Sequence, residues 1–404
     1  MAASLLSHVV SDLCIGKPPV RVLPPSTPVA AVLAALRAGS DPFVFVDTDQ
    51  LHSHGRKAAA GCVTNISVAD VLCYLCGDAD NLRDPTVALV RPVSSALAAG
   101  DDHGAAFRID SQTSLLDAID LLLINGCHCL LVPLHARARN RRHNHHVSAS
   151  DYCVLTREDI VRHLFSYSIS LFSPVASLTV AALGLVRRDT DDVRAVHADD
   201  DALDAIPLLR KSIADGTAVA VVSDDDGALL GEICPGVLGS CGDVVESVSA
   251  ALAALSAADA MTYIDCSLSP PEFLLRSIRA QLKDRGLDAM ADLMDVTADV
   301  DAASLQLSPS SSSSASSDED SPVGRGRRAR RASSGSFRWR STEGVAVCHA
   351  GSSLVAVMAQ ALAHRVGYVW VVDEVTGALA GVVSFADVLA VLREHLRAGA
   401  TQMN

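Results

Sequence analysis

The fold is decided by the C-terminal stretch Tyr368-Val-Trp-Val-Val-Asp-Glu-Val-Thr-Gly-Ala-Leu-Ala-Gly-Val-Val-Ser-Phe-Ala-Asp387. Two runs rich in β-branched residues surround Gly377 and predict a pair of buried strands joined by a turn. Before them, apolar residues from Leu354 to Leu362 recur at offsets 0, 3, 4, 7 and 8, which describe one face of a helix. After them, Ser384 begins a second apolar helix pattern. The predicted unit is helix, strand, turn, strand and helix.

The same order occurs three more times upstream. The first copy ends at Ser67-Val-Ala-Asp70 and the second at Thr156-Arg-Glu-Asp159. The third copy is degenerate, because Cys234 and Val237 replace the hydroxyl residue and the aspartate. Pro207 should also kink its first helix, since proline cannot donate the helical hydrogen bond. We therefore divide the chain into repeats at 8–76, 86–168, 190–242 and 345–398, a helical insertion at 243–300 and a disordered Ser/Arg-rich linker at 303–341.

The composition restricts the class of protein. The 404 residues carry a formal net charge of −14, which argues against a nucleic-acid partner because phosphate neutralisation supplies most of such affinity. The 11 scattered cysteines argue against an oxidised secreted framework, and no run predicts a membrane span. We expect an intracellular protein, cytoplasmic or nuclear, without membrane contact. The basic run 325–331 is a nuclear signal, an anion contact or plain linker, and Ser333 after it is a candidate phosphosite.

The four copies resemble the CBS domain, the β-α-β-β-α module named after cystathionine β-synthase. The match is carried by Val371-Val-Asp373 with Gly377, and by Gly381-Val-Val-Ser-Phe-Ala-Asp387. The opening Val10-Ser-Asp-Leu-Cys-Ile-Gly-Lys-Pro-Pro19 is similar to plant CBS-domain-containing proteins of the CBSX class. The resemblance implies an α/β (α+β) fold in which copies one and two, and copies three and four, pair into two Bateman modules.

A Ser/Thr-x-x-Asp pattern closes three copies, at Ser67/Asp70, Thr156/Asp159 and Ser384/Asp387. One interpretation is a capping box, in which the hydroxyl and the carboxylate satisfy free amides at a helix start. The resemblance to CBS domains implies a second role. The aspartate would accept hydrogen bonds from the ribose hydroxyls of an adenosine nucleotide, and the Ser or Thr hydroxyl would face ribose or phosphate.

Phosphate recognition needs cations, and the resemblance implies that they precede the first core strand. His128 and Arg365 occupy that neighbourhood, whereas Gly367 stands where γ-type kinase subunits often carry a histidine. The alternatives are a partly buried strand residue for His128 and a surface helix end for Arg365. The His/Arg-rich loop 134–150 is a metal or polyanion site, or a solvated insertion. Because no carboxylate or thiolate stands at a fixed spacing, we favour the insertion and predict no metal.

Enzymatic motifs are absent from the sequence: there is no G-x-S-x-G, GxxxxGK[ST] or H-E-x-x-H. The lone Cys73-Tyr-Leu-Cys76 is better explained by core packing than by redox chemistry. We predict a non-enzymatic regulator that senses AMP, ADP, ATP or S-adenosylmethionine and modulates a partner protein, for which a kinase is one candidate. The alternatives are an interaction scaffold with little or no ligand binding, or a γ-like subunit of a sucrose-non-fermenting-related kinase. A homodimer remains open in each case.

Overall fold

The computed structural model describes residues 8–39, 42–47, 63–98, 105–124, 127, 129–134, 152–267, 269–294 and 344–401. His128, Ser333, the predicted linker 303–341 and the His/Arg-rich loop beyond Leu134 lie outside these ranges. Our expectations for them stay predictions.

Four repeats follow the order β-α-β-β-α, as the sequence predicts. Repeat 1 contains β1 (Val22–Leu23), α2 (Val29–Ala38), β2 (Phe43–Asp47), β3 (Val63–Ser67) and α3 (Val68–Cys76). Repeat 2 contains β4 (Ala105–Arg108), α7 (Leu115–Ile124), β5 (Cys129–Pro133), β6 (Tyr152–Thr156) and α8 (Arg157–Ser168). Repeat 3 contains β7 (Ala195–His197), α10 (Ala205–Asp215), β8 (Val219–Val222), β9 (Leu229–Ile233) and α11 (Pro235–Ser240). Repeat 4 contains β10 (Val347–Cys348), α16 (Leu354–His364), β11 (Tyr368–Val372), β12 (Leu379–Ser384) and α17 (Phe385–Thr401).

Each repeat has the same strand pairing, which repeat 4 illustrates. β10 pairs with β11 in parallel, and β11 pairs with β12 antiparallel. The turn between β11 and β12 is stabilised by Asp373, whose Oδ1 accepts hydrogen bonds from the amides of Val375 (3.0 Å) and Thr376 (2.9 Å). Gly377 closes the turn at a φ of 71°, a left-handed conformation that costs glycine little.

Short helices connect the repeats. α4 (Ala79–Arg83), α5 (Pro85–Val90) and α6 (Val93–Ala98) lie between repeats 1 and 2. The 3-10 helix η3 (Ile169–Phe172) and α9 (Ser173–Ala176) follow repeat 2, and the 3-10 helix η1 (Val10–Cys14) precedes repeat 1. The stretch predicted as a helical insertion contains the 3-10 helix η5 (Gly242–Val244), α12 (Val245–Ala254), α13 (Ala257–Asp265) and α14 (Glu272–Asp284). On α14 the buried residues are Leu274, Ile278 and Leu282, which lie on one face of the helix.

Pro207 lies near the start of a helix, not in the helix interior that the predicted kink assumes. A short 3-10 helix, η4 (Ala202–Asp204), ends just before α10, so Pro207 is the third residue of α10. Amides in the first turn of a helix have no intrahelical acceptor, so proline removes no hydrogen bond there. The proline is thus accommodated in the first turn of α10.

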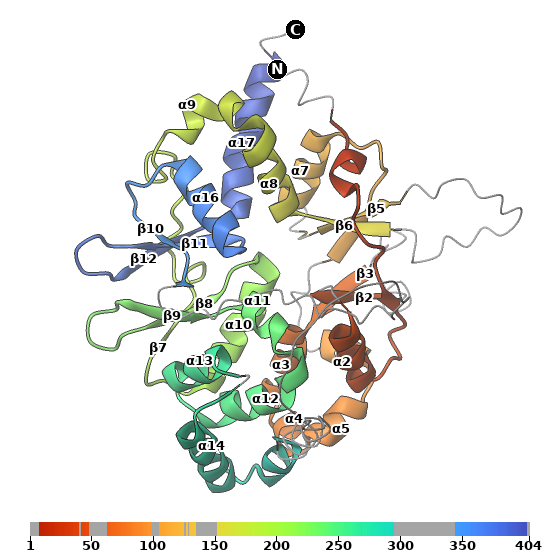
Figure 1. The fold of residues 1–404 in the computed structure, drawn as a ribbon, viewed down its shortest axis with the longest axis vertical. Helices are drawn as coiled ribbons and strands as arrows, with labels where there is room; N and C mark the ends of the chain where they lie inside the picture. The colour runs from red at the N-terminus through yellow and green to blue at the C-terminus, as the bar shows by residue number, and fades with distance from the viewer. Residues whose placement is uncertain are drawn as a thin grey trace, which may run out of the picture.

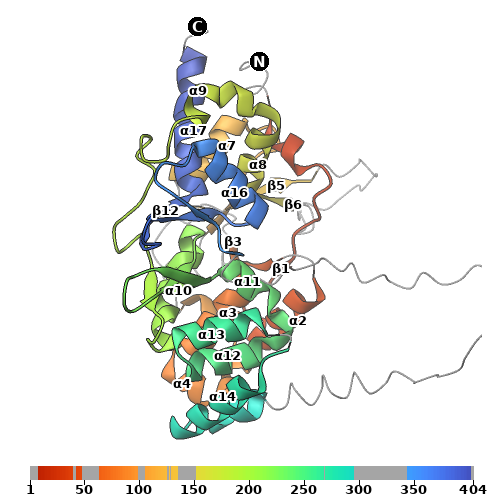
Figure 2. The same ribbon diagram turned by 60° about the vertical axis from the view of Figure 1, so that its left-hand side comes forward.

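The repeats pair along the strands and pack across the helices (Figure 1). β3 pairs with β4, which joins repeats 1 and 2 into one six-stranded sheet, and a bridge between Ala228 and Ala378 links the hairpins of repeats 3 and 4. One hydrophobic core combines helices of repeats 1 and 3, including α3, α10 and α12, and a second combines those of repeats 2 and 4. Figures 1 and 2 both show these two helical groups on either side of the strands. Each core is therefore shared by the two pairs of repeats, 1 with 2 and 3 with 4.

Within the part of the chain described above, no helix has the length and apolar character needed to span a bilayer.

Candidate functional site

In repeat 1 an aspartate in the first turn of α3 is held by the residue that begins the helix. The Oδ2 atom of Asp70 accepts hydrogen bonds from the amide (2.7 Å) and the hydroxyl (2.6 Å) of Ser67. The Ser67 hydroxyl in turn accepts from the Asp70 amide at 3.3 Å. These bonds satisfy backbone amides that the helix cannot pair itself. The geometry is a capping box, and it fixes the carboxylate where β3 ends.

Repeats 2 and 4 repeat this geometry closely. The amide and hydroxyl of Thr156 donate to Asp159 Oδ2 at 2.8 and 2.7 Å. The amide and hydroxyl of Ser384 donate to Asp387 Oδ2 at the same two distances. The capping interpretation therefore describes all three Ser/Thr-x-x-Asp patterns. The ribose-binding role remains a prediction for each pair.

Repeat 3 lacks this arrangement. Cys234 occupies the position before α11 and makes no side-chain capping bond, and Pro235 begins the helix. Val237 stands where the other repeats have aspartate. Repeat 3 thus offers no carboxylate at this helix start, as its sequence predicts.

Two of the aspartates also have a basic partner that our sequence reasoning missed. Lys17 Nζ lies 2.5 Å from Asp159 Oδ2 and donates to the Val154 carbonyl at 2.8 Å. Arg187 donates to Asp387 Oδ1 through Nε at 2.8 Å and through a terminal nitrogen at 2.7 Å. Both cations come from segments outside the β-α-β-β-α units. The signal in the sequence is the similarity of residues 10–17 to residues 180–187, which share an apolar pattern that ends in a basic residue.

Arg187 belongs to a group of charges gathered from three repeats. Burial alone would lower the pKa of Arg187, but Asp387, Asp192 and Asp215 together outweigh it, so the pKa is raised. Arg157, the first residue of α8, donates to the Leu122 carbonyl at 3.0 Å, and burial lowers its pKa although Asp215 and Asp387 oppose that effect. Asp215, at the end of α10, forms an ion pair with the buried Arg194. Residues from repeats 2, 3 and 4 therefore interact electrostatically near Asp387.

Asp70 lies in a more enclosed place than the other two aspartates. Its exposure is 7%, and every residue of α3 is buried, because the helix packs against α10, α11 and α12. Arg210 of α10 reaches across to donate to the Cys73 carbonyl of α3 at 2.8 Å. Repeat 1 thus offers its carboxylate at a contact between the two modules.

Of the two predicted phosphate contacts, only Arg365 lies within the described residues, and its role stays a prediction. Arg365 is the exposed residue that ends α16, with a φ of 55° in the left-handed region. Among the described residues, no hydrogen bond or ion pair joins it to Ser384 or Asp387. This position matches the alternative of a surface helix end.

The cysteines of α3 behave as core residues. Cys73 and Cys76 are both buried. Burial raises the pKa of Cys73 well above its ordinary value and that of Cys76 to about 12, so neither is a reactive thiolate at neutral pH. Over the described residues, no group of His, Cys, Asp and Glu has the arrangement of a metal site.

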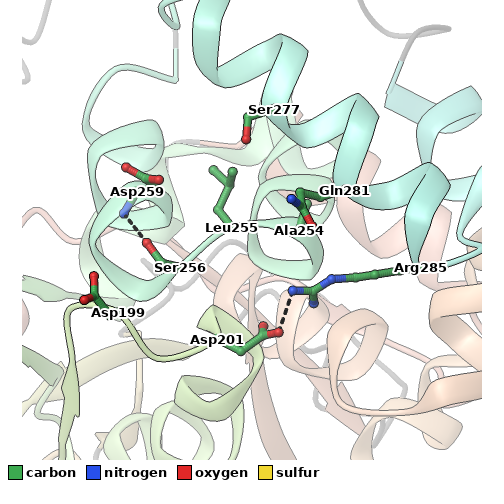
Figure 3. Close-up of a pocket in the computed structure, with 9 residues that line it drawn as sticks. All are labelled: Asp199, Asp201, Ala254, Leu255, Ser256, Asp259, Ser277, Gln281 and Arg285. Carbon is green, nitrogen blue, oxygen red and sulfur yellow. Dashed lines mark hydrogen bonds and ion pairs between the residues drawn. The ribbon is translucent and has the colours of Figure 1, made fainter.

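A polar cavity of about 300 Å³ lies away from the capping aspartates, between the start of repeat 3 and the inserted helices. Figure 3 shows Asp199, Asp201 and Asp259 on one side and Ser277, Gln281 and Arg285 of the α14 region on the other. Arg285 and Asp201 form an ion pair of 2.6 Å across it. This ion pair joins α14 to repeat 3. We therefore interpret the polar residues that line the cavity as structural.

Comparison with known proteins identifies relatives along nearly the whole chain, although no family model matches it. The CBS domain-containing protein CBSX5 of Arabidopsis thaliana is 36% identical over 98% of this chain and 99% of that protein. CBSX6 of the same plant is 23% identical over 98% of this chain and 95% of its own length. The SNF1-related protein kinase regulatory subunit gamma-like PV42b, also from Arabidopsis, is 25% identical over 90% of this chain and 84% of that protein.

A solved structure supports the fold. Protein MJ1225 of Methanocaldococcus jannaschii, described as an archaeal homologue of γ-AMPK, superposes with a TM-score of 0.51 over 95% of this chain and all of that chain, at 13% identity. The four β-α-β-β-α repeats, the pairing of their strands into sheets and the match to CBSX5 along nearly its whole length all indicate the same family. The chain belongs to the CBSX class of plant CBS domain-containing proteins.

Proposed function

We propose that this protein is a non-catalytic regulator whose Bateman modules bind an adenosine-containing molecule and transmit its presence to a partner protein. The observation that supports this most strongly is the set of three carboxylates held in one geometry, at Asp70, Asp159 and Asp387. Each uses Oδ2 for the helix cap. A vicinal diol such as ribose supplies two donors that suit a carboxylate beside such a cap, because hydrogen bonds to charged groups are the stronger kind.

Repeat 3 has no such carboxylate, so the proposal assigns three ribose sites to the chain rather than four. AMP, ADP, ATP and S-adenosylmethionine all carry the adenosine ribose that this site would recognise. We further propose that a phosphate contact in repeat 4 comes from Arg187 or Arg157, which lie near Asp387, rather than from Arg365 at the end of α16.

Transmission would use the shared cores. Because helices of repeats 1 and 3 form one core and those of repeats 2 and 4 another, a shift within one module changes packing in the other. A ligand that binds one arrangement of the modules more tightly shifts the population toward it. The partner would recognise that arrangement, and the similarity to a kinase regulatory subunit makes a kinase the partner class to test first.

The second candidate is an interaction scaffold without ligand binding. It is favoured by one observation: Lys17 and Arg187 already occupy the carboxylates of repeats 2 and 4. In that case the capping boxes and ion pairs serve stability alone.

Titration calorimetry of the full chain with each of the four molecules separates the two candidates. Binding that is weakened by Asp70→Asn, Asp159→Asn or Asp387→Asn supports the sensor. Absence of heat for all four, together with unchanged thermal unfolding at saturating concentrations, supports the scaffold, since a ligand that binds only the folded state must stabilise it.

A further inference from the structure

Two segments outside the four β-α-β-β-α units lie on the structure in the same way. We call them strap 1 (residues 9–17) and strap 2 (residues 179–187). Strap 1 bridges to Ser114 at the start of α7, with hydrogen bonds from Val10 N to Thr113 O at 3.0 Å and from Leu115 N to His8 O at 3.1 Å. Strap 2 bridges to Ser353 at the start of α16, with bonds from Val180 N to Ser352 O and from Leu354 N to Leu178 O, both 2.9 Å.

The straps end at equivalent residues of their repeats. Lys17 follows the bridge residue Val9 by eight positions, and Arg187 follows Thr179 by eight. Lys17 contacts Asp159 and the carbonyl of Val154, five residues before that aspartate. Arg187 contacts Asp387, and its backbone pairs with Val382, five residues before that aspartate. The register is identical in both modules, although one strap carries lysine and the other arginine.

Strap 2 lies close against β12. The amide of Arg187 donates to the Val382 carbonyl and the Val382 amide donates to the Arg187 carbonyl, each at 3.0 Å. Gly381 allows this approach, because a Cβ there would lie 2.5 Å from the Arg187 carbonyl oxygen. In strap 1 the buried Cys14 lies close to the buried Cys153 of β6, and each thiol shifts the pKa of the other. Each strap is thereby attached to the strand that leads to the aspartate.

We propose that Lys17 and Arg187 are built-in competitors for the ribose subsites of repeats 2 and 4. This inference rests on the proposed function and adds how the two sites are regulated. Arg187 pairs with the Oδ1 atom of Asp387, and Lys17 pairs with the capping Oδ2 atom of Asp159. A ribose that approaches either aspartate therefore competes with a cation for the same carboxylate. Strap 2 belongs to the connection between the two modules, so displacement of Arg187 would couple binding in repeat 4 to that connection.

Partial exposure makes such displacement feasible. The side chains of Lys17 and Asp159 are 24% and 22% exposed, and those of Arg187 and Asp387 are 31% and 15% exposed. Ion pairs with this access to water are weak and are further weakened by salt. An ion pair that only stabilised the fold would have the same strength whether or not a ligand is bound.

The test uses adenosine, which has the ribose but no phosphate, so that loss of a cation cannot weaken a phosphate contact. Calorimetry compares the wild type with Lys17→Met, Arg187→Met and the double variant. The matched control is Arg188→Met, because Arg188 is the exposed neighbour of Arg187. Thermal unfolding verifies that each variant folds. Since partly exposed ion pairs are worth up to about 1 kcal/mol, each strap variant should bind adenosine about two- to five-fold more tightly.

Salt provides a second readout. Raising the ionic strength should tighten adenosine binding to the wild type, because it weakens both ion pairs, and should leave the double variant unchanged. Equal or weaker binding by the strap variants, with wild-type binding intact, would overturn the competitor proposal and leave the sensor proposal standing. Adenosine binding by none of the proteins would overturn the sensor proposal, and the competitor proposal with it.

Discussion

Substitution of Gly381 by alanine tests how strap 2 lies on repeat 4. The added Cβ would lie 2.5 Å from the Arg187 carbonyl oxygen and 2.6 Å from Val186 Cγ1, both too close for real contacts. One of these atoms belongs to the backbone, which cannot rotate away. Either the strap leaves β12 or the strand distorts.

The cost follows from the contacts at stake. If strap 2 moves, the two 3.0 Å backbone bonds between Arg187 and Val382 are lost, at about 0.5–1.5 kcal/mol each. If it stays, overpacking costs about 1–3 kcal/mol. Both routes predict that Gly381→Ala lowers the free energy of unfolding by about 1–3 kcal/mol.

Urea denaturation measures this loss against a glycine control. Gly239 in α11 has no atom within 4 Å of an added Cβ, so Gly239→Ala should be neutral, or stabilising by about 0.5–1 kcal/mol. Equal stability of Gly381→Ala and the wild type would refute the placement of strap 2. A loss of the same size in both glycine variants would show that the effect is not specific to the strap.

Three further outcomes are expected. Asp387→Asn should weaken adenosine-nucleotide affinity by about 1.5–3 kcal/mol in calorimetry, since it removes the charge from a ribose hydrogen bond, and an unchanged affinity would exclude this carboxylate from the site. Glu232→Ala should lower the free energy of unfolding by about 1–3 kcal/mol for each buried donor left unpaired, because Glu232 Oε2 accepts from Tyr368 OH and Trp370 Nε1, both at 2.7 Å. Glu232→Gln, which keeps an acceptor, should lose less. Burial and the nearby His8 lower the pKa of His163, although Asp12 opposes them, so the unfolded chain takes up a proton more readily and stability should fall as pH drops below about 6.5. Unfolding midpoints of His163→Gln should lose part of that pH dependence, and an identical pH profile would contradict the assignment.

Local patterns in the sequence were sufficient to predict the four repeats. The apolar spacing from Leu354 to Leu362 and the β-branched run after Tyr368 depend on neighbours in the chain, and both became the expected elements. The capping boxes were predictable for the same reason, since hydroxyl and carboxylate are three residues apart. The effect of Pro207 was not predictable from the sequence, because it depends on where the helix starts. Hydrophobic periodicity locates helix starts poorly.

The cations at the carboxylates depend on contacts that no local pattern contains. Lys17 meets Asp159 across 142 positions of sequence, and Arg187 meets Asp387 across 200. The same holds for the cores that combine repeats 1 and 3, and repeats 2 and 4. Only the folded arrangement brings these residues together.

The straps also distinguish repeats 2 and 4, whose aspartates they contact, from repeats 1 and 3. The segments that lead into repeats 2 and 4 form helices as they leave the partner repeat: Val93, after the bridge of Pro92 to Pro28, begins α6, and Ala257, after the bridge of Ser256 to Asp201, begins α13. Straps 1 and 2 instead remain short or irregular and end in a cation beside a carboxylate. This contrast between a helical connection and a strap recurs in both modules, so it is a property of the two-repeat unit. A regulator built from two such units would carry one strap-controlled carboxylate in each, with Asp70 as the third carboxylate, enclosed at the contact between modules.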